Sequence, residues 1–213
     1  MLIFDNVILL FYNFVGDFMN TIKNNMQSIK IIKKSKFITK IFFIQNVDEA
    51  LKFINDTKTE YSDATHVCYG YICDNNIKFS DDNEPSNTAG MPIYNVLKNN
   101  NLNHVLAIVI RYFGGIKLGA GGLVRAYSNC VSEIIQNNLT KIIPGYLIEI
   151  AFDYNNIKEI EYILKDYEII YKNYDINIVF NFKCSSNDFD TLRYKLNDYV
   201  DEIEIKKDII IKR

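Results

Sequence analysis

Residues Arg111–Tyr127 read RYFGGIKLGAGGLVRAY, and the rest of the sequence is organised around this glycine-rich stretch. It contains five of the nine glycines, which are Gly114, Gly115, Gly119, Gly121 and Gly122. An apolar run at 105–110 precedes it and predicts a buried strand, and the periodicity of 123–135 predicts a helix. A glycine loop between a strand and a helix presents backbone N–H groups and lets a ligand or another backbone approach closely.

Three cations, Arg111, Lys117 and Arg125, lie in or beside the loop. Cations together with converging N–H groups predict a site for an anion. The stretch is not a Walker A loop, because no Gly-Lys-Ser/Thr follows, and it does not fit GxGxxG with an acidic residue downstream. The residues alone therefore indicate that an anion or a backbone approaches here, and nothing finer.

The composition fits a folded protein with one large or two small domains. The chain has 213 residues, of which 48% are apolar, and its net charge is −2, so neither disorder nor a strongly basic nucleic-acid binder is indicated. Residues 1–144 carry 14 Lys/Arg against 12 Asp/Glu, and residues 145–213 carry 10 against 14. The acidic C-terminal part argues against nucleic acid running over that half.

Four scattered cysteines with no CxxC pair favour reduced thiols in a cytoplasmic protein. A zinc site built from His66, Cys68 and Cys73 would lack a fourth ligand at a suitable spacing. We therefore expect no metal and no cofactor.

The first 18 residues, MLIFDNVILLFYNFVGDF, do not match the rest of the chain. They lack the basic start of a signal peptide and the length of a membrane span, so no membrane partner is expected. We interpret 1–18 as a dispensable apolar extension before a functional start at Met19. A peripheral amphipathic anchor is the alternative.

Apolar periodicity and turn residues predict the order of elements in both halves. In the first, strands are expected at 29–35, 37–44, 64–73, 77–79 and 105–112, with helices at 46–57, 91–99 and 123–138. Either Asn46 or Asp48 can cap the first helix. Pro144–Gly145 is the expected boundary, giving domains 19–143 and 145–213. The second half reads strand, helix, strand, strand, helix, strand, which is typical of a ferredoxin-like sandwich.

A second motif is the acidic loop 80–90, SDDNEPSNTAG. Its candidate residues are Ser80, Asp81, Asp82 and Glu84. They could bind Mg²⁺ or perform acid–base chemistry, or they could cap the next helix and pair with Arg111 or Arg125. With no nucleophile motif nearby, we favour structure or binding over catalysis. The DATH stretch adds three polar candidates, Asp63, Thr65 and His66.

These motifs together resemble the YigZ/IMPACT family. The match runs from KSKFI at 34–38, through DATH at 63–66 and FSDDNEPSNTAGMPI at 79–93, to RYFGGIKLGAGGLVRAY. The resemblance implies an N-terminal IMPACT domain of a ribosomal-protein type β-α-β fold, followed by a ferredoxin-like domain. The fold class is therefore α+β with two domains.

The sequence departs from the family pattern at three positions in and next to the acidic loop. The family usually has Gly where this chain has Asn83 and Asn87, and Asn is the residue next most able to take a positive φ. The family usually has a basic residue where Met91 stands, which weakens any anion site at the loop end.

The resemblance implies a link to translation. Eukaryotic IMPACT binds a co-activator of an initiation-factor kinase and uses an additional RWD domain, and nothing before residue 29 is long enough to be one. We therefore favour a non-enzymatic factor that binds RNA, the ribosome or a protein of the translation machinery, without DNA specificity. An enzyme acting on a small phosphorylated or anionic substrate is the alternative, and pure scaffolding by both loops is a third hypothesis.

Overall fold

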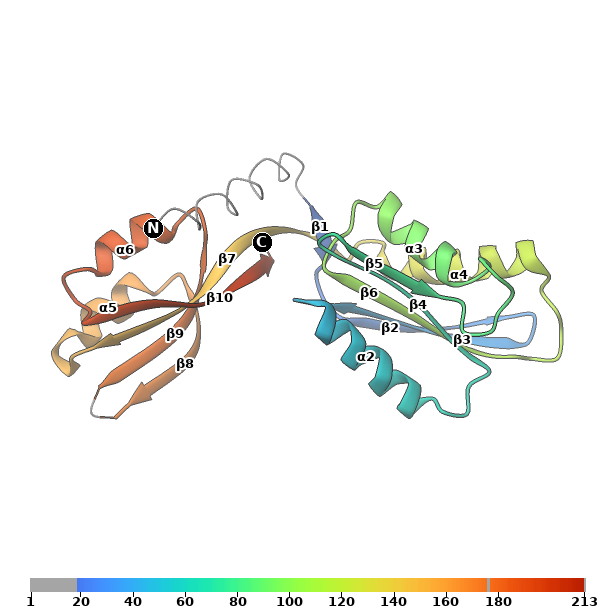
Figure 1. Ribbon diagram of the computed structural model, residues 1–213, viewed down its shortest axis with the longest axis horizontal. Helices are drawn as coiled ribbons and strands as arrows, with labels where there is room; N and C mark the ends of the chain where they lie inside the picture. The colour runs from blue at the N-terminus through green and yellow to red at the C-terminus, as the bar shows by residue number, and fades with distance from the viewer. Residues whose placement is uncertain (1–18, 176, 213) are drawn as a thin grey trace. The chain divides into compact units, whose positions relative to one another are not determined.

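The computed structural model describes residues 19–175 and 177–212 (Figure 1). The chain divides into two compact units, Met1–Lys141 and Ile142–Arg213. Each unit has an antiparallel sheet, helices and its own apolar core, so the two-domain α+β fold expected from the sequence is confirmed. The interpretation of 1–18 as dispensable lies outside the described residues.

The N-terminal unit is built on a five-stranded antiparallel sheet with the spatial order β2-β3-β6-β4-β5. The strand bounds are Met26–Ile32 for β2, Ser35–Phe43 for β3, Val105–Tyr112 for β6, His66–Cys73 for β4 and Asn76–Ser80 for β5. A short strand, β1 (Asn20–Ile22), pairs separately with the first residues of β7, Leu139–Lys141.

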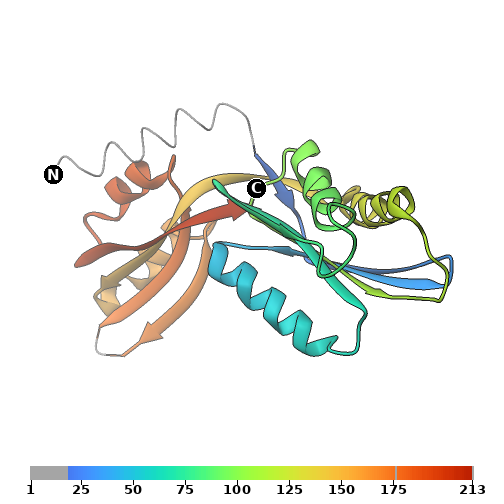
Figure 2. The ribbon, with the colours of Figure 1, turned by 45° about the vertical axis from the view of Figure 1, so that its right-hand side comes forward.

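Helices cover both faces of this sheet. The helix α2 (Val47–Glu60) lies on one face, and α3 (Gly90–Asn99) and α4 (Ala120–Ile135) lie on the other (Figure 1, Figure 2). Along the central strand, Ile108 packs in the α2 core and its neighbour Val109 packs in the α3–α4 core. A strand buried on both faces explains why the apolar run at 105–110 is continuous rather than alternating.

Local sequence signals fix two helix ends. Of the two expected caps for α2, Asn46 is the one used, since its Oδ1 accepts a 3.0 Å hydrogen bond from the Glu49 N–H. The prediction that the glycine-loop helix runs to residue 138 is wrong, because α4 ends at Ile135. Asn137 takes a left-handed φ of 65°, which stops the helix, and β7 begins two residues later.

The C-terminal unit has the ferredoxin-like order expected from the sequence. Its sheet is antiparallel with the order β10-β7-β9-β8, and its helices pack with the buried phenylalanines of β9 in one core. The elements are β7 (Leu139–Phe152), η1 (Tyr154–Asn156), α5 (Ile157–Ile163), β8 (Glu168–Tyr174), β9 (Ile178–Ser185), α6 (Phe189–Leu196) and β10 (Glu202–Lys212). The strand β7 runs without a break through Pro144 and Gly145, where we expected a boundary.

A buried histidine ties the end of the N-terminal sheet together. His104 is almost fully buried, and its Nε2 lies 2.9 Å from Asp74 Oδ1, while its Nδ1 lies 3.1 Å from the Ile44 carbonyl oxygen and 3.8 Å from Cys73 Sγ. Burial lowers the pKa of His104, but the hydrogen bonds to Asp74 and Cys73 outweigh it and raise the pKa to about 9. Possible metal-ligand atoms of Cys73, Asp74 and His104 lie within 4.8 Å of one another, yet both ring nitrogens already have hydrogen-bond partners.

We predict that Asp74→Asn lowers stability in a pH-dependent way. The pKa of His104 is raised on folding, so the stabilisation is fully present below the ordinary value of 6.5 and is lost as pH rises through about 9. The variant should lose on the order of 2 kcal/mol near neutral pH and little above pH ~10. Urea unfolding across this range checks it, with the exposed Asp56→Asn as control. A pH-independent difference would contradict the account.

Candidate functional site

Asp81 is the anchor of the acidic loop. Its Oδ1 accepts hydrogen bonds from the N–H groups of Ala89 at 2.9 Å and Gly90 at 2.8 Å, and its Oδ2 accepts one from Asn87 at 2.8 Å. Ala89 has no side chain that could cap α3, so the carboxylate supplies the cap from eight residues earlier. Both carboxylate oxygens of Asp81 are therefore engaged in holding the loop against the helix.

The loop also depends on residues that can adopt a left-handed backbone. Asn83 and Asn87 have φ values of 67° and 61°, so the expectation that asparagine replaces glycine there with a positive φ is confirmed. Asp82 has a φ of 43°, and its Oδ2 accepts a 2.6 Å hydrogen bond from the Val67 N–H. Its own N–H donates to Ser80 Oγ at 3.3 Å. All of these contacts are local to the loop and β4.

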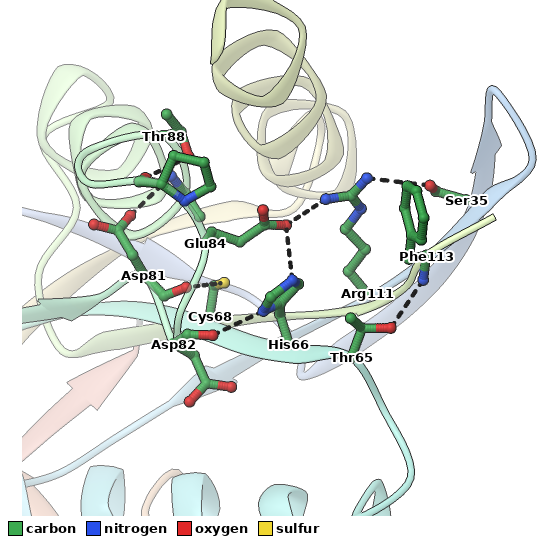
Figure 3. A network of polar contacts seen from close by, with 12 residues as sticks. Ser35, Thr65, His66, Cys68, Asp81, Asp82, Glu84, Thr88, Arg111 and Phe113 are labelled. Carbon is green, nitrogen blue, oxygen red and sulfur yellow. Dashed lines mark hydrogen bonds and ion pairs between the residues drawn. The ribbon is translucent and has the colours of Figure 1, made fainter. Parts of the chain in front are cut away.

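Glu84 joins the acidic loop to the glycine-rich segment. It is 8% exposed, and its Oε1 accepts hydrogen bonds from Arg111 at 2.6 Å and from the Tyr127 hydroxyl at 2.7 Å. Figure 3 shows Glu84 between Arg111 and His66, whose Nε2 lies 3.8 Å from the same oxygen. The two motifs thus meet in space, and the place where they meet is buried.

Arg111 is held on both sides of its guanidinium group. It is 4% exposed, with one nitrogen on Glu84 and the other donating to Ser35 Oγ at 3.3 Å (Figure 3). Among the described residues its Nε is the one buried side-chain nitrogen or oxygen without a hydrogen-bond partner. A buried, paired guanidinium cannot also receive a phosphate from solvent, so Arg111 acts here as structure.

Groups that could act as nucleophiles in this cluster are kept neutral. Burial raises the pKa of the Cys68 thiol far above its usual range, and burial does the same to the pKa of the Tyr127 hydroxyl. Cys68 Sγ donates to the Asp81 carbonyl oxygen at 3.0 Å, and His66 Nδ1 lies 2.8 Å from the Asp82 carbonyl oxygen. A protonated, buried thiol is unreactive.

The DATH stretch fixes the start of the glycine loop. Thr65 Oγ1 accepts a 3.0 Å hydrogen bond from the Phe113 N–H, and Asp63 accepts one of 2.8 Å from the Tyr112 hydroxyl. Ser35 Oγ accepts from the Gly114 N–H at 3.2 Å. A Cβ on Gly114 would lie 2.0 Å from the Lys34 carbonyl carbon, so only glycine allows the loop to lie against the β2–β3 turn.

Beyond Gly114 the loop faces solvent. Gly115 and Gly119 have φ values of 83° and 73°, and an added Cβ on either would meet nothing within 4 Å among the described residues. Gly119 is the N-cap of α4 and has no side chain to satisfy the first N–H groups of the helix. Lys117 and Arg125 are exposed, with Arg125 Nε donating to the Gly121 carbonyl oxygen at 3.1 Å.

The predicted site residues therefore separate into two groups. Asp81, Glu84 and Arg111 make hydrogen bonds that connect elements of the fold. The other group remains at the surface and consists of Lys117, Arg125 and the glycines at 115, 119 and 121. Sequence reasoning did not single out Ser35 and Tyr127, which complete the buried cluster, although both lie inside the quoted motifs.

Two further findings concern the described residues: the four cysteines are unpaired and buried, and no described helix is long and apolar enough to cross a bilayer.

Comparison with known proteins places this site in a family. The Impact N-terminal domain matches residues 33–135. IMPACT family member YvyE of Bacillus subtilis is 37% identical over 171 residues, which are 75% of this chain and 76% of that protein. IMPACT family member YigZ of Escherichia coli is 36% identical over 118 residues, 53% of this chain and 58% of that protein. A solved crystal structure of a hypothetical protein aligns with a TM-score of 0.60 and 30% identity, covering 84% of this chain and 91% of that one.

We predict that Glu84→Gln is strongly destabilising. It leaves the Arg111 guanidinium buried without a counter-charge, which costs about 3–5 kcal/mol. Urea unfolding should show this loss, and Arg111→Met introduced into the Glu84→Gln background should cost far less than it does alone. The control is Asp63→Asn, which keeps an acceptor for Tyr112 at an exposed position. A loss below ~1 kcal/mol for Glu84→Gln would mean that water solvates the pair.

Proposed function

The chain belongs to the IMPACT family, and we propose that it is a non-enzymatic RNA-binding factor linked to the regulation of translation. RNA would contact the N-terminal unit at the exposed part of the glycine loop. The observation that carries this proposal is the separation of the site: the acidic side chains are engaged in structural hydrogen bonds, while Lys117, Arg125 and the uncapped N–H groups of α4 stay at the surface.

The start of α4 supports binding of a phosphate. This helix has 16 residues, and its first N–H groups carry a partial positive charge that no N-cap side chain neutralises. Glycines at 121 and 122 in the first turn, and the open space at Gly115 and Gly119, let a phosphate oxygen come close to the backbone. Lys117 and Arg125 flank this helix end with full positive charges.

The β2–β3 hairpin adds a second set of cations to the same surface. Residues 20–40 contain six lysines and no Asp or Glu; of these, Lys30 pairs with Glu133 and Lys40 with Glu60. Lys33 and Lys34 form the turn, are exposed, and lie beside the glycine loop, because the Lys34 carbonyl packs against Gly114. Both have left-handed φ values of 45° and 65°, an unfavourable conformation for lysine that is consistent with selection for function. Phosphate contacts of this kind give salt-dependent, sequence-independent affinity for RNA.

The enzymatic alternative is less well supported. A catalyst acting on a small phosphorylated substrate would need a free carboxylate or a reactive nucleophile in the acidic loop. Asp81 uses both oxygens to bind backbone N–H groups, Glu84 is paired and buried, and the Cys68 thiol is protonated. Asp82 is partly exposed, yet it accepts from Val67 and lies 3.6 Å from Lys58.

The link to translation rests on family membership, and it favours ribosomal or messenger RNA as the ligand. If this surface contacts the ribosome, we expect the contact to be made with RNA phosphates. This expectation differs from binding to a protein of the translation machinery. The C-terminal unit has more acidic than basic residues, so its composition does not favour binding to RNA phosphates. We therefore assign RNA binding to the N-terminal unit.

We predict that the full chain binds RNA with an affinity that falls as salt rises, and that the Lys117→Ala/Arg125→Ala double variant binds more weakly. Each lost phosphate contact should reduce the slope of log affinity against log salt by about 0.7–1. Fluorescence anisotropy with a labelled oligoribonucleotide measures this.

The matched control for that experiment is Lys158→Ala/Lys195→Ala. It removes the same charge from exposed positions on the C-terminal helices α5 and α6 and should leave the slope unchanged. Binding that is unmeasurable even at low salt, or equal losses in the two double variants, would refute the proposal.

We also predict that Lys33→Asn/Lys34→Gly stabilises the protein and weakens RNA binding. Asn-Gly is the preferred sequence for a two-residue turn with positive φ at both positions, so the free energy of unfolding should rise by on the order of 1 kcal/mol. Loss of two exposed cations should lower affinity for RNA several-fold at low salt. Urea unfolding and anisotropy measure the two effects on the same sample. A stabilised variant with unchanged affinity would exclude the hairpin turn from the RNA surface.

A further inference from the structure

We infer that Phe113 is a stacking platform for a nucleobase and that the RNA surface prefers single-stranded RNA over duplex. This inference rests on the proposed function and adds the class of RNA. It concerns the residue that follows the end of β6 and begins the exposed glycine loop, next to the buried Arg111.

Phe113 is an aromatic side chain left at the surface of the N-terminal unit. It is 46% exposed, the highest value among the described aromatic side chains of the N-terminal unit. The other aromatic residue in the exposed class among the described residues of this unit is Phe79, at 37%, and its ring stacks on Tyr94 with centroids 5.7 Å apart. Ile116, three residues after Phe113, is 40% exposed, so the loop presents two apolar side chains amid its glycines and cations.

The backbone at Phe113 is held in place before any ligand arrives, and one contact to the ring comes from Arg111. The N–H of Phe113 donates to Thr65 Oγ1 at 3.0 Å (Figure 3). The next N–H, of Gly114, donates to Ser35 Oγ at 3.2 Å. The Arg111 guanidinium carbon lies over the ring, 5.5 Å from its centroid. Arg111 is in turn fixed by Glu84 and Ser35. A preorganised aromatic side chain loses little conformational entropy on binding, so more of the stacking energy appears as affinity.

The position of Phe113 places it within the cations that would hold the RNA backbone. Lys117 follows it in the same loop, and the turn residue Lys34 lies against Gly114, the residue after Phe113. An aromatic ring next to phosphate-binding groups is the arrangement by which proteins bind single-stranded nucleic acid without sequence preference.

The chemistry of this platform selects against duplex RNA. In a duplex the base faces are already stacked on their neighbours, so an aromatic side chain has no free face to cover. A single strand offers unstacked bases together with phosphates. The lysines and the helix N-terminus alone would bind both forms, whereas Phe113 adds affinity for single strands only. The Glu84–Arg111 pair then has a second role, because Arg111 contacts the Phe113 ring and Glu84 holds Arg111 in place.

The test compares a single-stranded oligoribonucleotide with a duplex of the same length, using Phe113→Leu and Phe113→Tyr. Base–aromatic stacking is strong enough that Phe113→Leu should weaken single-strand binding by about tenfold and change duplex binding less than about twofold. Phe113→Tyr should retain wild-type affinity. Because the side chain is exposed, both variants should fold, and urea unfolding verifies that.

Two further variants separate this inference from the function on which it rests. Tyr194→Leu, at an 85% exposed aromatic residue of α6, should change neither affinity. Lys117→Ala should weaken both RNA forms. If Lys117→Ala weakens both and Phe113→Leu weakens neither, RNA binding stands and the stacking platform is overturned. If no RNA form binds wild type, both proposals fail. Equal losses for single strand and duplex in Phe113→Leu would make the residue a general loop support and would also overturn the platform.

Discussion

The buried pair between Glu84 and Arg111 is the interaction on which the arrangement of the functional loops depends. It connects the acidic loop before α3 to the end of the central strand, and Tyr127 and Ser35 extend it to α4 and β3. A charge pair with so little exposure contributes little net stability over an apolar replacement, but breaking it is costly. It therefore fixes one arrangement of four elements. The exposed glycine loop begins two residues after Arg111, so the position of the loop depends on this pair.

This division explains why a loop rich in carboxylates need not be a catalytic site. The acidic side chains accept hydrogen bonds from the protein itself. Asp81 caps α3, Asp82 accepts a hydrogen bond from the N–H of Val67 at the start of β4, and Glu84 pairs with Arg111. The two motifs meet at the buried contact of Glu84 with Arg111 and Tyr127. Next to this contact, the cations of the glycine loop and of the β2–β3 turn lie at the surface. A polyanion fits such a surface better than a small substrate that needs a carboxylate.

Much of the fold could be predicted from the sequence, and the site could be predicted only in part. Strand and helix periods indicated the element order of both units, and Asn83 and Asn87 were expected at positive φ from residue chemistry alone. The apolar period of this helix ends at residue 135, as α4 does, but the predicted extension to about residue 138 was wrong, because nothing in the sequence distinguishes Asn137, which has a left-handed φ, from Gln136 and Asn138. For Arg111 the sequence left two interpretations open, an anion site and a pair with the acidic loop, because nothing in it states whether a cation at a strand end is buried; the structure shows the pair. Its partner Glu84 lies 27 residues away, and only the fold brings them to 2.6 Å. Ser35 was not predicted as a site residue, because a single serine in a strand has no sequence pattern that indicates its hydrogen-bond partners.

The central claim is that the motifs divide into a buried clamp and an exposed surface for RNA phosphates. The most direct measurement is a titration of isotope-labelled full chain with a short oligoribonucleotide, followed by backbone amide chemical shifts. The account predicts that the largest shifts fall on the amides of Gly115, Gly119 and Gly121 and on the turn residues Lys33 and Lys34, with Asp81 and Asn87 unmoved. Shifts centred on the acidic loop, or confined to the C-terminal unit, would contradict it.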